Sequence, residues 1–170
     1  KEQLFPKTYH YRSRMTEDVI KGIKTLVKDS KKFLGPLKKK NVLDIGCNDG
    51  SLLDQFKKQG SYTFGVEPTN AAVDAKEKGH IIFHNYFDKV TANKINKTIK
   101  TVDLITFTNV FAHIEDLSSL LKNLKKIITS NTYLIIENHY LGSVLEKKQF
   151  DTFYHEHPRT YSFTSFLKIS

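Results

Sequence analysis

Short apolar segments alternate with helix-like segments along the middle of the chain, and this alternation constrains the fold more than any other feature. Buried strands are predicted at residues 42–45, 62–66, 81–83, 102–107 and 133–137. Helices are predicted between them, at residues 51–59, 69–78, 88–99 and 117–128. Strands joined through helices run parallel and need right-handed crossovers. The sequence therefore predicts an α/β fold, a parallel sheet with helices on both faces, and a ligand site outside the carboxyl ends of the strands.

The first forty residues precede this alternation. They are predicted to form an irregular arm and then a helix from Thr16 to Leu34, whose apolar side chains keep a helical period until Gly35 and Pro36 end it. We therefore divide the chain into an N-terminal arm and helix, residues 1–40, and a core, residues 41–170. The whole length of 170 residues is about that of one domain.

The composition of the chain indicates its cellular location but does not identify a binding partner. The chain has no apolar run long enough to span a bilayer, and a single cysteine cannot form an internal disulfide, so we expect a cytoplasmic location without membrane contact. The net charge of +9 comes from short, scattered lysine runs. It has two interpretations, a solvated surface or a field that attracts phosphorylated ligands. Charge alone predicts no nucleic-acid partner, and only strongly salt-dependent RNA binding would revive one.

The first core strand runs into a glycine-containing loop, LDIGCNDGS. Gly46 and Gly50 remove side chains where the backbone must turn and approach a ligand closely. Asn48 occupies the place of the middle glycine that a diphosphate-binding loop requires. Asp44 stands at the strand end, where a carboxylate suits a cationic ligand. The loop therefore favours a ligand that carries a sulfonium and an ammonium group and no phosphate.

A second acid, Glu67, ends the second core strand, 21 positions after Gly46. Such an acid accepts hydrogen bonds from ribose hydroxyls, although alone it is more typical of a solvated loop or a helix cap. Together with the loop it resembles motif I and the ribose acid of class I S-adenosylmethionine-dependent methyltransferases, which have a Rossmann-like core. The resemblance implies S-adenosylmethionine as cofactor. The further cofactor-binding residues that it implies are Cys47, Asn48, Tyr86, Phe87 and Asn109, with core packing an alternative role for Phe87.

Polar side chains also follow the fourth strand and gather near the carboxyl end. Residues 108–114 lack the proline pair with which many methyltransferases grip a planar amine, so an exocyclic amine acceptor is disfavoured. Residues 151–157 hold a phenol, carboxylates and two imidazoles, which is typical of a general acid–base cluster. A metal site, a surface cluster and helix capping are the alternatives. Metal is the weakest, since the ligands are too close in sequence and no cysteine is near, and we expect none.

Three longer strings, NVFAHIEDL, ENHYLGSVL and FDTFYHEHPRTYSFTSF, resemble the sugar C-methyltransferases that build branched deoxysugars on nucleotide carriers. That resemblance implies a nucleotide-linked 4-keto-6-deoxy sugar, methylated at the carbon beside its ketone through an enolate. It implies that Tyr154, Glu156 and His157 are catalytic, with His157 as the base and Glu156 orienting it. Asn109 and His113 would lie beside the reacting sugar.

The chain departs from that family in three ways. It lacks the family's clustered zinc-binding cysteines, Pro158 follows His157 where leucine is usual, and it stops at Ser170 within a predicted helix. We expect a core truncated before the last two strands, whose fifth strand forms an edge that another segment or a second copy covers. Cofactor affinity should then survive while turnover is weak. The alternatives are a methyltransferase of another small acceptor and a truncated cofactor-binding module without turnover.

Overall fold

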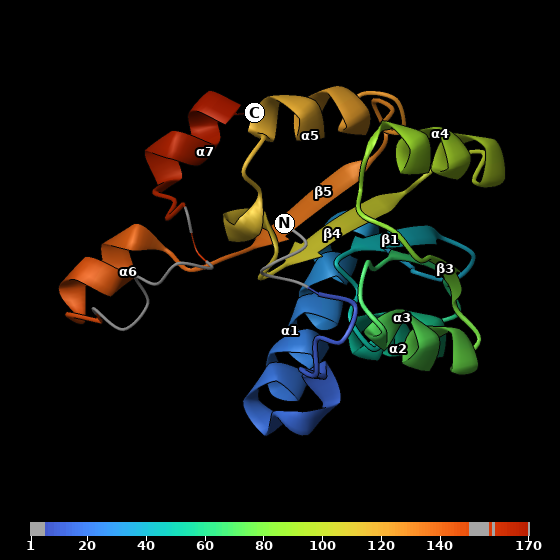
Figure 1. Cartoon of the computed structure of the whole chain (residues 1–170), viewed down its shortest axis with the longest axis horizontal. Coiled ribbons are helices and arrows are strands. Elements are labelled where there is room, and N and C mark those ends of the chain that lie inside the picture. Colours follow the sequence, from blue (N-terminus) through green and yellow to red (C-terminus); the bar gives the residue numbers. More distant parts are fainter. Residues whose placement is uncertain (1–5, 150–156, 158, 170) are drawn as a thin grey trace.

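Five parallel strands form the centre of the molecule (Figure 1). The computed structural model describes residues 6–149, 157 and 159–169. The sheet order is β3-β2-β1-β4-β5. The strands are β1 (Asn41–Ile45), β2 (Tyr62–Val66), β3 (Ile81–Phe83), β4 (Leu104–Thr108) and β5 (Tyr133–Glu137). The predicted parallel α/β sheet is confirmed, and each strand lies within two residues of its predicted bounds.

Helices connect the strands and extend the chain at both ends. They are α1 (Glu17–Leu34), α2 (Ser51–Lys58), α3 (Ala71–Glu77), α4 (Lys89–Thr98), α5 (Leu117–Leu124), α6 (Leu141–Glu146) and α7 (Phe163–Ile169). Two short 3₁₀ turns, η1 (Ser13–Met15) and η2 (Phe111–His113), and the helix α6 were not predicted, because segments of three to six residues carry too little periodicity. Among the described residues, no helix is long and apolar enough to cross a membrane.

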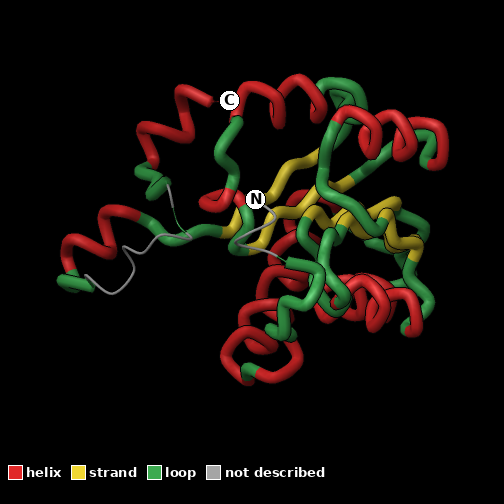
Figure 2. The backbone as a smooth tube through the Cα atoms, in the orientation of Figure 1, coloured by secondary structure: helices red, strands yellow, loops and turns green. Residues whose placement is uncertain are grey.

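Side chains of alternate strand residues build two separate cores, one on each face of the sheet. Val42 and Leu104 face α1 and α2, in a cluster that includes Phe56 of α2. Leu43 and Ile105, one position further along the same strands, face α4 and α5. Period-2 alternation in buried parallel strands produces this division, and helices lie on both sides of the strands in Figure 2.

The helix of the N-terminal segment belongs to one of these cores. Ile23 and Val27 of α1 are buried against the sheet in the same cluster as Val42 and Leu53. The helix ends at Gly35, whose φ of +67° is a conformation that glycine adopts without strain. Packing of α1 on the sheet brings the preceding arm to the carboxyl ends of the strands.

The end of the chain returns to the same region. β5 pairs with β4 and forms the edge of the sheet among the described residues. After α6, Tyr161 forms an isolated parallel bridge with Tyr140 and accepts a hydrogen bond from the Leu141 amide at 2.9 Å. The Tyr161 ring is buried against Phe111, with ring centroids 5.3 Å apart. These contacts hold the segment before α7 beside the turn that follows β4.

Candidate functional site

A cavity of about 1000 Å³ opens at the carboxyl ends of β1, β2 and β4. This is where the strand order changes direction, the usual ligand position in open α/β sheets. Its walls come from the arm, from the loops after the first five strands and from His157. Lining residues that the sequence predicted are Asp44, Gly46, Cys47, Asn48, Glu67, Tyr86, Phe87, Asn109, His113 and His157.

The cavity floor is the loop between β1 and α2. Gly46 has a φ of +79°, and a Cβ there would lie 2.4 Å from a methyl carbon of Val110. Gly50 has a φ of +76°, and its Cβ would meet the His80 ring at 2.8 Å. Both glycines are therefore required by conformation and by space. Gly46 lines the cavity, whereas Gly50 does not line it and is the N-cap residue of α2.

Asn48 occupies the position of the middle glycine, and its conformation and side-chain hydrogen bonds suit an asparagine there. Its φ of +49° is one that asparagine tolerates, and its side chain is occupied by the arm. The Asn48 Oδ1 atom accepts hydrogen bonds from the Ser13 amide at 3.0 Å and the Asp49 amide at 2.9 Å, and its Nδ2 atom donates to the Tyr11 carbonyl at 3.1 Å. The side chain predicted to bind cofactor therefore joins the loop to the arm, while the residue still lines the cavity.

Glu67 is buried and held by its neighbours. Its Oε2 atom accepts from the Asn48 amide at 2.9 Å. Its Oε1 atom accepts from the Thr69 amide at 2.9 Å and the Thr69 hydroxyl at 2.6 Å. A carboxylate offers about four lone-pair sites, so these bonds leave capacity for a further donor such as a ribose hydroxyl. The residue thus carries both roles considered from the sequence, a loop cap and a cavity-facing acceptor.

Asp44 is the most perturbed acid of the site. It is buried, and burial raises its pKa to about 7, while the Thr106 hydroxyl, 2.7 Å from its Oδ1 atom, opposes the shift. The negative charges of Glu67 and Glu137 raise the same pKa further. Among the described residues, no cation forms an ion pair with Asp44 or Glu67. A buried acid with this pKa gains most from a cationic ligand, which the sulfonium and ammonium groups of S-adenosylmethionine would supply.

Cys47 and Phe87 have mixed roles. The Cys47 sulfur packs against Gly65, and burial raises the pKa of its thiol, so the side chain is a neutral part of the core. Phe87 packs against the core of the α4 and α5 face and also lines the cavity, so its two predicted roles coexist. Tyr86 is half-buried at the cavity wall.

Imidazoles gather on the opposite side of the cavity. The ring centroids of His113 and His157 are 4.7 Å apart, and those of His139 and His157 are 5.2 Å apart. All three residues line the cavity beside Asn109, which has a φ of +55° and donates its amide to the Glu137 carbonyl at 2.9 Å. The predicted catalytic residues Tyr154 and Glu156 lie outside the described residues. Within the described chain, no three His, Cys, Asp or Glu residues are arranged to hold a metal ion.

Three residues of this region were not predicted. His139 follows β5 within the string ENHYLGSVL, and its position after a strand end was the available signal. Thr108 lines the cavity, and within the described structure its buried hydroxyl has no hydrogen-bond partner. Arg159 donates from Nε to the Ile114 carbonyl at 3.1 Å and from an Nη atom to the Glu115 carbonyl at 2.6 Å. These two bonds fix the segment that carries His157 against the loop that follows His113.

Comparison with known proteins places the chain in a family. A family model for the methyltransferase domain matches residues 11–169. The C-methyltransferase NovU of Streptomyces niveus is 27% identical over 162 residues, which are 95% of this chain and 39% of NovU. The ubiquinone biosynthesis O-methyltransferase of Histophilus somni (strain 2336) is 29% identical over 109 residues, which are 58% of this chain and 44% of that protein. The chain thus spans about two fifths of the length of these relatives.

A solved structure shares the fold. The plantazolicin methyltransferase BpumL, crystallised with a desmethyl plantazolicin analogue and SAH, superimposes with a TM-score of 0.66 at 15% identity, over 87% of this chain and 60% of that one. SAH is what remains of S-adenosylmethionine after methyl transfer. Since the family model covers the sheet, the loop with its two glycines and the buried acids, this chain belongs to the methyltransferase domain family, and it shares the fold of a methyltransferase crystallised with SAH.

Proposed function

We propose that this domain methylates a carbon atom beside the ketone of a nucleotide-linked 4-keto-6-deoxy sugar. One observation carries the proposal. The imidazoles of His113 and His157 lie together in the cavity that the cofactor loop floors, with ring centroids 4.7 Å apart. Removing a proton from carbon needs a base within reach of that carbon, and neutral imidazole is the side chain best matched to that task near pH 7.

The cofactor supplies an electrophilic methyl group on sulfur when it is bound. On the protein side, His157 takes the proton from the carbon next to the ketone, and the electron pair of that C–H bond moves into the enolate. Asn109 and His113 line the same part of the cavity and donate hydrogen bonds to the developing enolate oxygen. One well-placed donor contributes about 3–4 kcal/mol to such a step. Asp44 and Glu67 would hold the cofactor, whose methyl group would pass to the enolate carbon while the electron pair of the S–CH₃ bond stays on the sulfur and the ketone is restored.

Similarity to NovU supports transfer to carbon. That protein is named a C-methyltransferase, and its alignment extends over 95% of this chain, including the histidine-rich end. The aligned O-methyltransferase covers only 58% of the chain. A small-molecule O-methyltransferase is therefore the second candidate.

Solvent deuterium separates the two candidates. With the keto-sugar and SAH present in D₂O, a C-methyltransferase exchanges the hydrogen beside the ketone without turnover, whereas an O-methyltransferase has no reason to exchange it. We expect exchange to fall about 1,000-fold in His157→Asn, within the range that general bases contribute. His84→Asn is the matched control, because His84 is an exposed imidazole that does not line the cavity. Equal exchange in both variants, or none in the unmodified chain, would overturn the proposal.

A further inference from the structure

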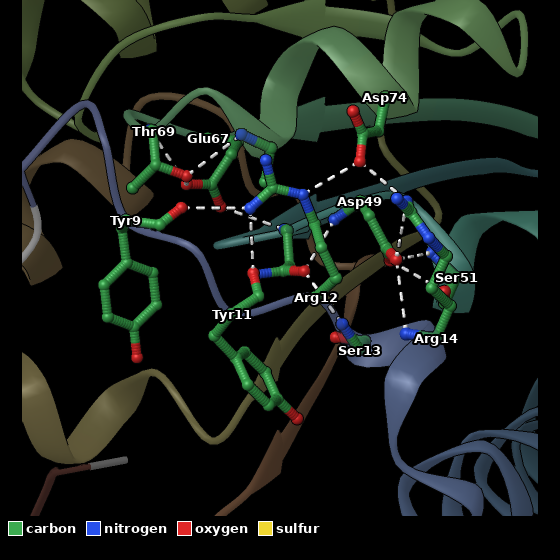
Figure 3. A network of polar contacts seen from close by, with 12 residues as sticks. Tyr9, Tyr11, Arg12, Ser13, Arg14, Asp49, Ser51, Glu67, Thr69 and Asp74 are labelled. Carbon is green, nitrogen blue, oxygen red and sulfur yellow. Dashed lines mark hydrogen bonds and ion pairs between the residues drawn. The ribbon is translucent and has the colours of Figure 1, made fainter.

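The arm, residues 6–16, crosses the cofactor loop and closes one side of the cavity. Tyr9, Tyr11 and Ser13 line the cavity together with Asn48 and Glu67. Figure 3 shows the backbone of this arm linked through side-chain contacts to the loop and to Asp74 of α3. The arm is thus one wall of the cofactor site, although it lies far from the rest of that wall in sequence.

Arg12 makes the central contact of the arm. Its Nε atom lies 2.8 Å from Asp74 Oδ2, and one Nη atom donates to the Tyr9 and Tyr11 carbonyls at 3.0 Å each. The Arg12 side chain is only 14% exposed. One guanidinium therefore fixes the bend of the arm and ties it to α3 at the same time.

Arg14 makes a second contact with the same carboxylate. Its Nη1 atom lies 2.6 Å from Asp74 Oδ2 and 3.3 Å from Asp49 Oδ2. Asp49 is fully buried, and its Oδ1 atom accepts from the amide and hydroxyl of Ser51 at the start of α2. Hydrogen bonds from Arg14, and then from Arg12, hold the pKa of Asp74 below its usual range. The contact stays charged over the physiological pH range.

Polar contacts, and not core packing, hold the arm in place. No residue from 6 to 16 is buried, and Met15 is 72% exposed. Further ties include the bonds of Asn48 to Ser13 and Tyr11, a hydrogen bond of 3.2 Å from the Arg14 amide to Asp49 Oδ2, and one of 2.8 Å from the Asn70 amide to the Lys7 carbonyl. Because the arm contributes little to the cores, it can leave the cofactor loop without unfolding the sheet.

We propose that Arg12 and Arg14 with Asp74 form a clasp that holds the arm shut over bound S-adenosylmethionine. These three are positioning residues, which act on the cofactor through the arm residues that line the cavity. Cofactor enters and leaves while the clasp is open, and closure retains it for the transfer step. The inference rests on the cofactor site alone and is independent of which acceptor is methylated.

Binding kinetics of SAH test the clasp. In Asp74→Asn both the association and the dissociation rate constants should rise, each by about tenfold, because closed molecules neither admit nor release ligand. A residue that only shaped the wall would raise dissociation and leave association unchanged or slower. Asp29→Asn is the matched control, since Asp29 pairs with Lys32 at 2.8 Å on α1 and does not contact the arm. Stopped-flow measurements give both constants for each variant.

A second measurement keeps the test decisive if Asp74→Asn folds poorly. Arg12→Gln and Arg14→Gln should produce the same paired acceleration, larger for the more buried Arg12, with little change in the melting temperature. Hydrogen exchange of the Ser13 amide, which donates to Asn48, should accelerate in both variants and slow on addition of SAH. Unchanged association rates in all three variants, or Ser13 exchange that ignores SAH, would overturn the clasp.

Discussion

The two sides of the cavity are built differently. On the cofactor side, Gly46, Asn48 and Glu67 lie within 22 residues, and the Asn48 and Gly46 amides donate to the Glu67 carboxylate and to the Val66 carbonyl next to it. On the proposed acceptor side, His113, His139 and His157 come from three segments, and Arg159 bonds the last of them to the loop that follows His113. The loop on the cofactor side is therefore a local motif to which the arm adds one wall, whereas the proposed acceptor side is assembled wholly from segments that are distant in sequence.

This difference separates what each side does. A cofactor that never changes is served by a fixed backbone, so its determinants are conformations and buried charges. An acceptor is served by side chains on loops, which can be exchanged without disturbing the sheet. If the comparison holds, changes on the cofactor side should alter binding of any ligand there. Changes on the acceptor side should alter the chemical step and leave cofactor affinity alone.

The largest effect on SAH binding is expected from Gly46→Ala. A methyl group at this position meets Val110 at 2.4 Å, and a φ of +79° strains any residue with a Cβ. SAH affinity should fall at least about 100-fold, equivalent to roughly 2.7 kcal/mol, by calorimetry. Gly22→Ala is the control, because nothing lies within 4 Å of a Cβ there and the residue is in the middle of α1. Retained affinity in Gly46→Ala would show that the loop is more adaptable than its contacts indicate.

The pH dependence of cofactor binding tests the charge of the same side. Asp44 has a pKa of about 7 in the free protein, so below pH 7 it must lose a proton to face a cationic ligand. Affinity for S-adenosylmethionine should therefore fall by up to about tenfold per pH unit below 7 and level off above it. Asp44→Asn should remove the dependence. A flat profile in the unmodified chain, measured by calorimetry from pH 5.5 to 8.5, would contradict this role.

The unfolding stability of the free protein should depend on pH in the opposite direction to cofactor affinity, because of the same Asp44 carboxyl. The folded pKa of Asp44 lies above the unfolded value near 4, so its contribution is fully present below pH 4 and is lost as pH rises to about 7. Asp44→Asn keeps an acceptor for the Thr106 hydroxyl without the buried charge. At pH 8 the variant should be more stable than the unmodified chain, by on the order of 2 kcal/mol in urea unfolding, and the difference should vanish near pH 4.

The same contrast explains how far the sequence could predict the structure. The order of strands and helices and the loop from Asp44 to Gly50 follow from local periodicity and consecutive residues, and they were predicted closely. The occupation of Asn48 by the arm was not predicted, because it pairs residues 35 positions apart that no periodicity links. His139 and Arg159 were missed as site residues for the same reason, since their roles depend on ring contacts and carbonyl acceptors far along the chain.

Arg159→Gln tests whether the hydrogen bonds of Arg159 position the proposed acceptor side. The change removes hydrogen bonds to the Ile114 and Glu115 carbonyls, so the segment carrying His157 should sample more positions. The rate of deuterium exchange beside the ketone should fall about tenfold, whereas SAH affinity should stay within about twofold. A parallel loss of SAH affinity would mean that the two sides of the cavity are coupled and do not act independently. Lys147→Gln, at the end of α6, supplies a control that also removes one cation.

The smallest effect on SAH binding is expected from Asn48→Gly, which tests the contact between the arm and the loop. Glycine adopts a φ of +49° without strain, and the backbone bond from residue 48 to Glu67 is retained, but the side-chain bonds to Ser13 and Tyr11 are lost. SAH should dissociate about three- to tenfold faster, the equivalent of one net hydrogen bond, with unfolding stability changed by less than about 1 kcal/mol. Asn109→Gly is matched in backbone, since Asn109 also has a positive φ, and it should leave Ser13 amide exchange unchanged. If Asn48→Gly also leaves Ser13 exchange unchanged, the Asn48 side chain does not hold the arm against the loop. The loop would then keep its structure without the arm, as a loop with a middle glycine does.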